Sequence, residues 1–224
     1  MSVILLRVMP VCRLDVLTLG NKLDDLLEVR RDRQVDVMFL TETWHDSDSV
    51  SLSRLRTDGY QVVDRQRPRQ STDTLSTNYG GVTAVAIQGI RLTRIDLGVA
   101  TGTFELLCVR VVSQSSSCVV AAVYRPGSVT VTASFFSELS DVLDCISTFA
   151  EPVLLVGDDN IRLDRPAAAD AVQFTELLAV HGLANHVTLP THELGGMLDV
   201  VASRVDQPPL LVDVHDVGLS DHRL

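Results

Sequence analysis

The feature that most constrains the fold is a series of short apolar runs, each typical of a buried β-strand and each followed by polar residues. The runs are DVMFLTE (36–42), YQVVDRQR (60–67), VTAVAIQ (82–88), FELLCVRVV (104–112), CVVAAVY (118–124), VLLVGD (153–158) and LLVDVHDVG (210–218). Runs of this length, rich in Val, Leu and Ile, predict strands. The stretch MSVILLRVMPVC predicts a further buried strand at the start, and SQSSS between two runs indicates a hairpin.

Helical patterns alternate with these strands. Residues 20–31, 134–149 and 167–181 carry apolar residues at helical spacing, and Gly182 is placed to end the last of them. Hairpins mixed with helix-separated strands predict an α/β (α+β) fold, in which two mixed sheets pack face to face as a sandwich flanked by helices. The sequence contains no internal repeat and no linker, which predicts a single domain over residues 1–224.

Composition narrows the functional class. A hydrophobic content of 46% excludes a disordered chain, and a net charge of -10 argues against a protein that coats nucleic acid non-specifically. Local binding of nucleic acid remains compatible with this charge. The apolar start is too short to span a membrane, and the 4 cysteines lack metal-ligand spacing, which predicts reduced thiols in an intracellular protein.

Several predicted strands or neighbouring segments carry a polar side chain that a metal ion or a phosphate can contact. These are Glu42, Tyr124, Asp158, Asn160, Asp199, Asp221 and His222. Each alone has a structural explanation, such as a surface carboxylate, a helix cap or a half-buried core aromatic. The adjacent carboxylates of Asp158 and Asp159 repel each other and resist burial, which indicates a divalent cation nearby.

Seven motifs, taken together, resemble a known superfamily. They are LTLGNKL, FLTETW, YGGVTAV, VYRPG, LLVGDDNIRLD, PTHELGGMLDVV and LSDHRL, which span about residues 14–224. The chain resembles the endonuclease/exonuclease/phosphatase superfamily and, within it, the endonuclease domain of non-LTR (LINE-type) retrotransposons. The resemblance implies a DNase I-like four-layer fold and a DNA-nicking endonuclease that hydrolyses a phosphodiester with Mg²⁺, or with Mn²⁺ in its place.

The resemblance also implies roles for the residues around the metal ion. Glu42 is expected to be the main metal ligand, with Asp221 near it. Asp158 is expected to align or deprotonate the attacking water. Asn160 is expected to hold the water or the phosphate in place.

Three further residues are expected to act on the phosphate. Tyr124 is expected to bond a phosphate oxygen, and His222, oriented by Asp199, to stabilise the developing charge. Hydrolysis of an anionic ester needs a cation on the phosphoryl oxygens, an oriented water and donors for the growing charge, and these residue types supply all three.

The sequence departs from the family pattern at three places. Asp15 stands where the family usually has an asparagine, near the metal, and Asp159 replaces the aromatic residue common in GDFN. The chain also stops just after SDHR, so the domain is expected to lack its last strand. The added charge of Asp15 predicts a weak or inactive nuclease, in which Asp15→Asn raises nicking on the order of tenfold or more.

Three hypotheses of function therefore stay open: a DNA-nicking endonuclease, a phosphomonoesterase of the same superfamily and a catalytically decayed, non-enzymatic remnant of a mobile element. PTHELGG and TETW favour the first, whereas Asp15, Asp159 and the abrupt end favour the third.

DNA is the expected partner, and no membrane is expected. Arg65, Arg67 and Arg69 are hypothesised to contact its phosphates, because an acidic protein needs a local basic patch. The resemblance further implies a monomer that acts in the nucleus, with a longer reverse-transcriptase polyprotein in related elements.

Overall fold

The computed structural model describes residues 2–6, 9–67, 80–208 and 210–222 and contains two six-stranded sheets. The first sheet has the order β12-β1-β2-β3-β5-β4. Its strands are β1 (Ser2–Leu6), β2 (Met9–Asp15), β3 (Val37–Thr41), β4 (Gln61–Arg65), β5 (Val82–Ala86) and β12 (Leu211–Val214). Only β2 and β3 pair in parallel among the described strands of this sheet, with Asp15 opposite Thr41.

The second sheet has the order β10-β11-β9-β8-β7-β6. Its strands are β6 (Arg91–Ile95), β7 (Glu105–Val112), β8 (Ser117–Tyr124), β9 (Val153–Asp158), β10 (Leu183–Asn185) and β11 (Asp199–Arg204). Within the described residues this sheet also has one parallel pairing, β8 with β9, in which Tyr124 lies opposite Asp158. Asp199 begins β11 and pairs with Asp158 from the other side.

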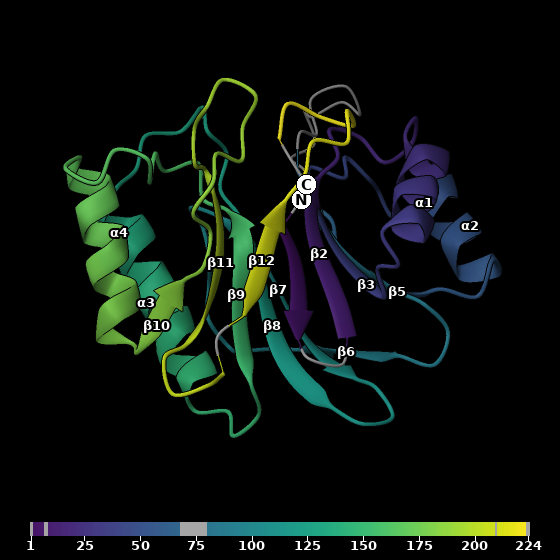
Figure 1. The fold of residues 1–224 in the computed structure, drawn as a ribbon, viewed down its shortest axis with the longest axis horizontal. Helices are drawn as coiled ribbons and strands as arrows, with labels where there is room; N and C mark the ends of the chain where they lie inside the picture. The colour runs from purple at the N-terminus through teal and green to yellow at the C-terminus, as the bar shows by residue number, and fades with distance from the viewer. Residues whose placement is uncertain (1, 7–8, 68–79, 209, 223–224) are drawn as a thin grey trace.

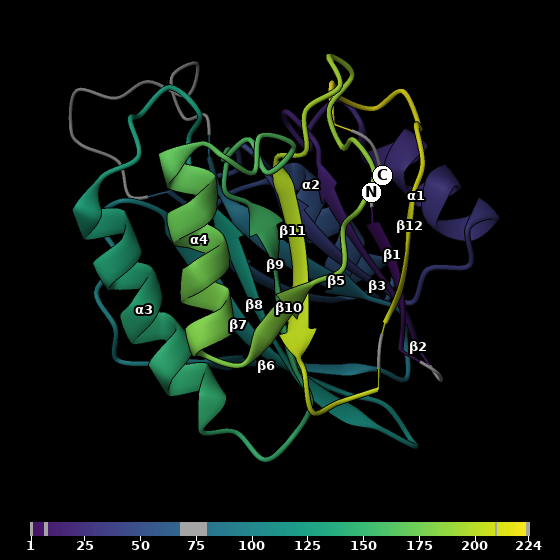
Figure 2. The same cartoon turned by 60° about the vertical axis from the view of Figure 1, so that its left-hand side comes forward.

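Helices cover the outer face of each sheet. They are α1 (Leu23–Asp32), α2 (Val50–Thr57), α3 (Ala133–Ser147) and α4 (Ala169–Val180). Helices α1 and α2 lie on the side of the first sheet, and α3 and α4 lie on the side of the second (Figure 1). Figure 2 shows α3 and α4 next to each other in front of the second sheet. No helix within the described ranges combines the length and apolar character needed to cross a membrane.

Three apolar clusters hold the four layers together, because each strand alternates its side chains between two apolar faces. Val11, Phe39, Val120 and Leu154 belong to the cluster between the two sheets. A second cluster joins the second sheet to α3 and α4, and a third joins the first sheet to α1 and α2. The predicted two-sheet sandwich flanked by helices is therefore confirmed.

Some predicted elements differ in extent. The first apolar stretch forms β1 and β2, which pair as antiparallel neighbours, rather than one strand. The late strand covers only Leu211–Val214. Strands β6 and β10 carry no clear pattern in the sequence, because β6 is a mostly exposed edge strand with two arginines and β10 has 3 residues. Gly182 ends α4 with a φ of 67°, as its position predicts.

The cysteines agree with the sequence prediction. Cys108 lies opposite Ala121 and Cys118 lies opposite Val111, so the two thiols do not face each other across the hairpin. All four cysteines are free.

Candidate active site

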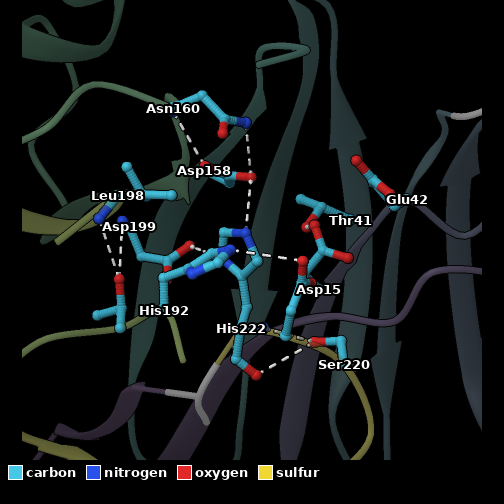
Figure 3. A network of polar contacts seen from close by, with 12 residues as sticks. Asp15, Thr41, Glu42, Asp158, Asn160, His192, Leu198, Asp199, Ser220 and His222 are labelled. Carbon is cyan, nitrogen blue, oxygen red and sulfur yellow. Dashed lines mark hydrogen bonds and ion pairs between the residues drawn. The ribbon is translucent and has the colours of Figure 1, made fainter. Parts of the chain in front are cut away.

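Strand periodicity brings the predicted polar residues to one edge of the space between the sheets. On β2, Asp15 shares a face with Val11, and on β9, Asp158 shares a face with Leu154; both apolar residues belong to the cluster between the sheets. The same alternation places Thr41, Tyr124 and Asp199 on inward faces of their own strands. These strand ends form the candidate active site (Figure 3).

Glu42 and Tyr124 connect the two sheets at this edge. Glu42 follows β3 with a φ of 53°, a left-handed conformation that non-glycine residues rarely adopt. The Tyr124 hydroxyl donates a hydrogen bond to Glu42 Oε1. Burial raises the pKa of Glu42, and burial together with Glu42 raises the pKa of Asp15 well above its usual range. These two carboxylates therefore gain most from a nearby cation.

Asn160 fixes the orientation of Asp158. Its backbone N–H donates to Asp158 Oδ1 at 2.9 Å, and its Nδ2 donates to Asp158 Oδ2 at 2.9 Å and to the Arg125 carbonyl at 2.8 Å. Asn160 has a φ of 50°, which points its side chain back toward β9. Burial raises the pKa of Asp158 to about 6, so this carboxylate is mostly ionised at neutral pH.

His222 lies between the two carboxylates at the ends of β9 and β11. Its Nδ1 lies 3.2 Å from Asp199 Oδ2, and its Nε2 lies 3.7 Å from Asp158 Oδ2. Although burial opposes it, the hydrogen bond to Asp199 raises the pKa of His222 to about 9. The imidazole is therefore protonated at neutral pH and can donate from Nε2.

Asp199 is the most strongly stabilised anion of the group. Burial would raise its pKa, but Arg13 and His222 hold it at about 2. The Thr191 hydroxyl accepts from the Asp199 backbone N–H at 3.2 Å and fixes the start of β11. This agrees with the predicted orienting role of Asp199 toward His222, which stays a prediction.

Arg13 is the main site residue that the sequence did not reveal. It is 1% exposed, and it donates from Nη1 to Asp199 and from Nη2 to Thr41 Oγ1 at 2.8 Å. The sequence feature that could have revealed it is a charged residue inside an apolar strand, two positions before Asp15 and so on the same face of that strand. Because the first strand was predicted to end before Arg13, the alternation of side chains along a strand was not used to predict that Arg13 points inward.

His192, within the PTHELGG motif, is a second residue without a predicted role. It forms an isolated β-bridge with His222, and their rings meet edge to face at 5.1 Å. The Leu194 N–H donates to His192 Nδ1, which leaves the proton of a neutral ring on Nε2, 3.4 Å from Asp221 Oδ2. His192 therefore donates toward Asp221, the predicted metal ligand.

Two of the three arginines of the hypothesised DNA patch, Arg65 and Arg67, lie within the described residues and contact other parts of the protein. Arg65 donates to the Leu106 carbonyl at 2.7 Å, and Arg67 pairs with Glu105 and lies over the Tyr124 ring. Arg69 lies outside the described residues. DNA contact by these arginines stays a prediction.

Asp159 follows the last residue of β9 and is buried. It is 2% exposed, and neither carboxylate oxygen has a hydrogen-bond partner among the described residues. Burial, followed by the charge of Asp158, raises the pKa of Asp159 to about 8. Asp159 is therefore a buried acid next to Asp158, and no role in the site was predicted for it.

The donor atoms of the site suit a hard divalent cation. Glu42, Asp221, Asp15 and Asp158 offer carboxylate oxygens, which Mg²⁺ and Mn²⁺ prefer, whereas a protonated His222 offers no lone pair. Burial raises the pKa of both Glu42 and Asp15, and for Asp15 the neighbouring charge of Glu42 adds to it, although Arg13 and His222 act in the opposite direction. The residues present therefore fit such an ion.

Comparison with known proteins identifies a matching family and structures with the same fold. Residues 12–222 match the Endonuclease/Exonuclease/phosphatase family. The search of curated proteins finds no match.

Solved structures share the fold. The endonuclease domain of TRAS1, a telomere-specific non-LTR retrotransposon, superposes with a TM-score of 0.68 at 14% identity, covering 94% of this chain and 93% of that one. The AP endonuclease LMAP from Leishmania major gives 0.67 at 17% identity, covering 95% and 84%. The 3' phosphatase NExo from Neisseria, bound to a product DNA hairpin, gives 0.65 at 17% identity, covering 96% of each chain.

Proposed function

The chain belongs to the endonuclease/exonuclease/phosphatase family, and we propose that it is a divalent-metal-dependent phosphodiesterase that nicks DNA. The observation that carries this proposal is the arrangement of Asp158, Asp199 and His222. An ionised carboxylate and a protonated imidazole lie 3.7 Å apart at one strand edge, beside further carboxylates. Such a pair serves a reaction that both activates a water molecule and stabilises an oxyanion.

Each of these side chains has a distinct task in the proposed reaction. Asp158, held by two hydrogen bonds from Asn160, orients the attacking water and accepts its proton. His222 donates from Nε2 to a phosphate oxygen as its charge grows, while Asp199 holds Nδ1. Tyr124, whose hydroxyl bonds Glu42, would donate to a second phosphate oxygen after it releases that carboxylate.

Glu42 and Asp221 would hold the metal ion, with Asp15 beside them. The bound ion would supply Lewis-acid stabilisation of the phosphoryl oxygens. His192 supports this arrangement, because its Nε2 donates toward Asp221 and limits the directions that this partly exposed carboxylate takes.

The substrate and setting follow from the motifs. TETW and PTHELGG resemble the retrotransposon branch, and the endonuclease domain of TRAS1 shares the fold. We therefore infer that the substrate is double-stranded DNA, that the chain works as a monomer in the nucleus, and that it serves a retrotransposon. The NExo structure, described as a 3' phosphatase with a DNA hairpin product, favours DNA 3'-phosphate removal as the second candidate activity.

A plasmid assay tests the proposal. Supercoiled DNA is expected to be converted to the nicked form with Mg²⁺ and to stay intact with EDTA. Glu42→Ala and Asp158→Ala are each expected to lower the rate by about a hundredfold or more, while far-UV circular dichroism stays unchanged. Asp141→Asn, at an exposed position of α3, is the matched control.

The outcomes separate the candidate functions. Release of phosphate from a 3'-phosphorylated oligonucleotide without nicking would favour the phosphomonoesterase. Full activity of either alanine variant would contradict the assigned roles. A folded chain inactive on both substrates would identify a non-catalytic remnant.

The DNA contact is tested by salt dependence. Replacing Arg65, Arg67 and Arg69 together with Gln is expected to weaken DNA binding and to flatten the dependence of the binding constant on salt, because each phosphate contact releases a counterion. An unchanged slope would remove these arginines from the DNA footprint and leave Arg65 and Arg67 with the protein contacts that the structure shows.

A further inference from the structure

The floor of the candidate active site contains a positive charge that the proposed reaction does not use. Arg13 points from β2 into the space between the sheets, where its guanidinium contacts Asp199 and Thr41. An arginine side chain keeps its proton in proteins, so this charge is present whatever else binds. Its burial is complete enough that contact with bulk solvent is excluded.

Arg13 reaches carboxylates from three strands. Its Nη2 lies 3.8 Å from Asp15 Oδ2 and 3.9 Å from Asp158 Oδ2, while Nη1 contacts Asp199. The candidate ligand atoms of Asp15, Asp158 and His222 all lie within 4.8 Å of one another. Because the protonated His222 offers no lone pair, the oxygens of Asp15 and Asp158 are the donors of this group that a metal ion could use. A divalent cation placed among them would lie next to the guanidinium and would be repelled by it.

We propose that the Arg13 guanidinium is a fixed cation that takes the place of a metal ion among Asp15, Asp158 and Asp199. The inference rests on the proposed function, because it concerns the metal requirement of the same site. It leaves the divalent cation to Glu42 and Asp221.

The pairing of Arg13 with Asp15 explains how this chain carries a carboxylate where its family usually has an asparagine. The two residues lie two positions apart on one strand, so their side chains share a face. An ionised Asp15 and the Arg13 guanidinium together have a net charge of zero, and a single asparagine is also uncharged. Arg13 is thus a positioning residue, which holds Asp199 and through it His222, and contacts no reacting atom.

Counting bound metal ions tests the proposal without DNA. Wild-type protein and the Arg13→Met variant are titrated with Mn²⁺, and free Mn²⁺ is measured by electron paramagnetic resonance. Arg13→Met is expected to bind one more ion per chain than wild type. Arg13→Lys, which keeps the charge, is expected to bind the wild-type number. Arg13→Met/Asp15→Asn, which removes a ligand of the new site, is expected to return to it.

A matched control excludes a general effect of losing an arginine. Arg110 on β7 pairs with Glu151, apart from the site residues, so Arg110→Met is expected to leave the ion count unchanged. Kinetics give a second measurement: Arg13→Met should lower kcat on the order of tenfold or more while KM for DNA changes less than about threefold.

The result that would overturn the proposal is an equal ion count in wild type and Arg13→Met. If Arg13→Met is unfolded in EDTA, Mn²⁺ is expected to refold it, since the ion replaces the guanidinium; a variant that millimolar Mn²⁺ leaves unfolded also overturns the proposal. If the protein nicks DNA but wild type and Arg13→Met bind the same number of ions, only the proposed role of Arg13 is overturned. The expected counts in a chain without nicking would overturn the proposed function alone.

Discussion

Replacement of the buried acid Asp159 by its neutral isostere is expected to stabilise the fold, and to do so only above mildly acidic pH. Burial raises the pKa of the carboxyl group to about 8 in the folded chain, against its ordinary value of 3.8. The folded state therefore holds a proton that the unfolded state has released. Stability is lost as pH rises from about 4 to about 8, and the loss is constant above that range.

The size of the effect follows from the same two values. Each pKa unit corresponds to about 1.4 kcal/mol, so the shift costs on the order of 4 kcal/mol at pH 7. Asp159→Asn removes this cost but leaves a buried amide without a partner, which costs about 1–3 kcal/mol. We expect a net gain of about 1–3 kcal/mol at neutral pH. For a chain of this length, a gain of 2 kcal/mol raises the melting temperature by about 4–8 °C.

Urea unfolding in EDTA at several pH values measures this gain. The difference in unfolding free energy between Asp159→Asn and wild type should favour wild type by about 1–3 kcal/mol at about pH 4, where only the cost of the buried amide remains. It should change sign as the pH rises and reach its full positive value by about pH 8. Asp141→Asn, which changes an exposed aspartate on α3, should show no such trend. A gain that is equal at both ends of the pH range, or no gain at pH 8, would refute the idea that ionisation of Asp159 is the cost.

Further predictions concern the site and its support. Gly157→Ala should destabilise the chain by at least about 2 kcal/mol in the same urea assay, because a Cβ there would lie 2.1 Å from the Val123 carbonyl oxygen of the neighbouring strand. A variant whose unfolding free energy stays within about 0.5 kcal/mol of wild type, as for a neutral surface change, would contradict the close approach of β8 and β9. Asp15→Asn is now expected to change the nicking rate by less than about threefold, because Arg13 at 3.8 Å offsets the charge that the sequence alone left uncompensated. A gain of about tenfold would support the original expectation instead.

The layers and much of the site could be predicted from the sequence, because both depend on the spacing of apolar residues within short segments. The continuous apolar run in VLLVGD is typical of a strand buried on both faces, and the side-chain alternation of a strand puts Asp158 on the same face as Leu154 and Val156. The spacing of apolar residues likewise predicted α1, α3 and α4. The motif order then predicted that Glu42 and Asp158 come together, and the structure places both at one edge.

Contacts between side chains of the two sheets could not be predicted from the spacing of apolar residues within short segments. Arg13 and Asp199 are 186 positions apart in sequence, and nothing local indicates that their side chains meet. The same holds for His192, whose role depends on the bridge to His222. Asp159 was recognised as a departure from the family pattern, but its burial and the lack of a hydrogen-bond partner for its carboxylate among the described residues appear only in the folded structure.

The candidate active site is shared between the two sheets. Asp15 lies on the first sheet and Glu42 follows one of its strands, whereas Asp158 and Asp199 belong to the second sheet. Sliding of the two sheets by a fraction of an ångström would alter every distance between these halves while leaving each sheet's own hydrogen bonds intact. Catalysis thus depends on the thickness and fit of the apolar layer between the sheets. A substitution such as Phe39→Leu, deep in that layer, should lower the rate of the proposed reaction at temperatures at which the protein is still folded.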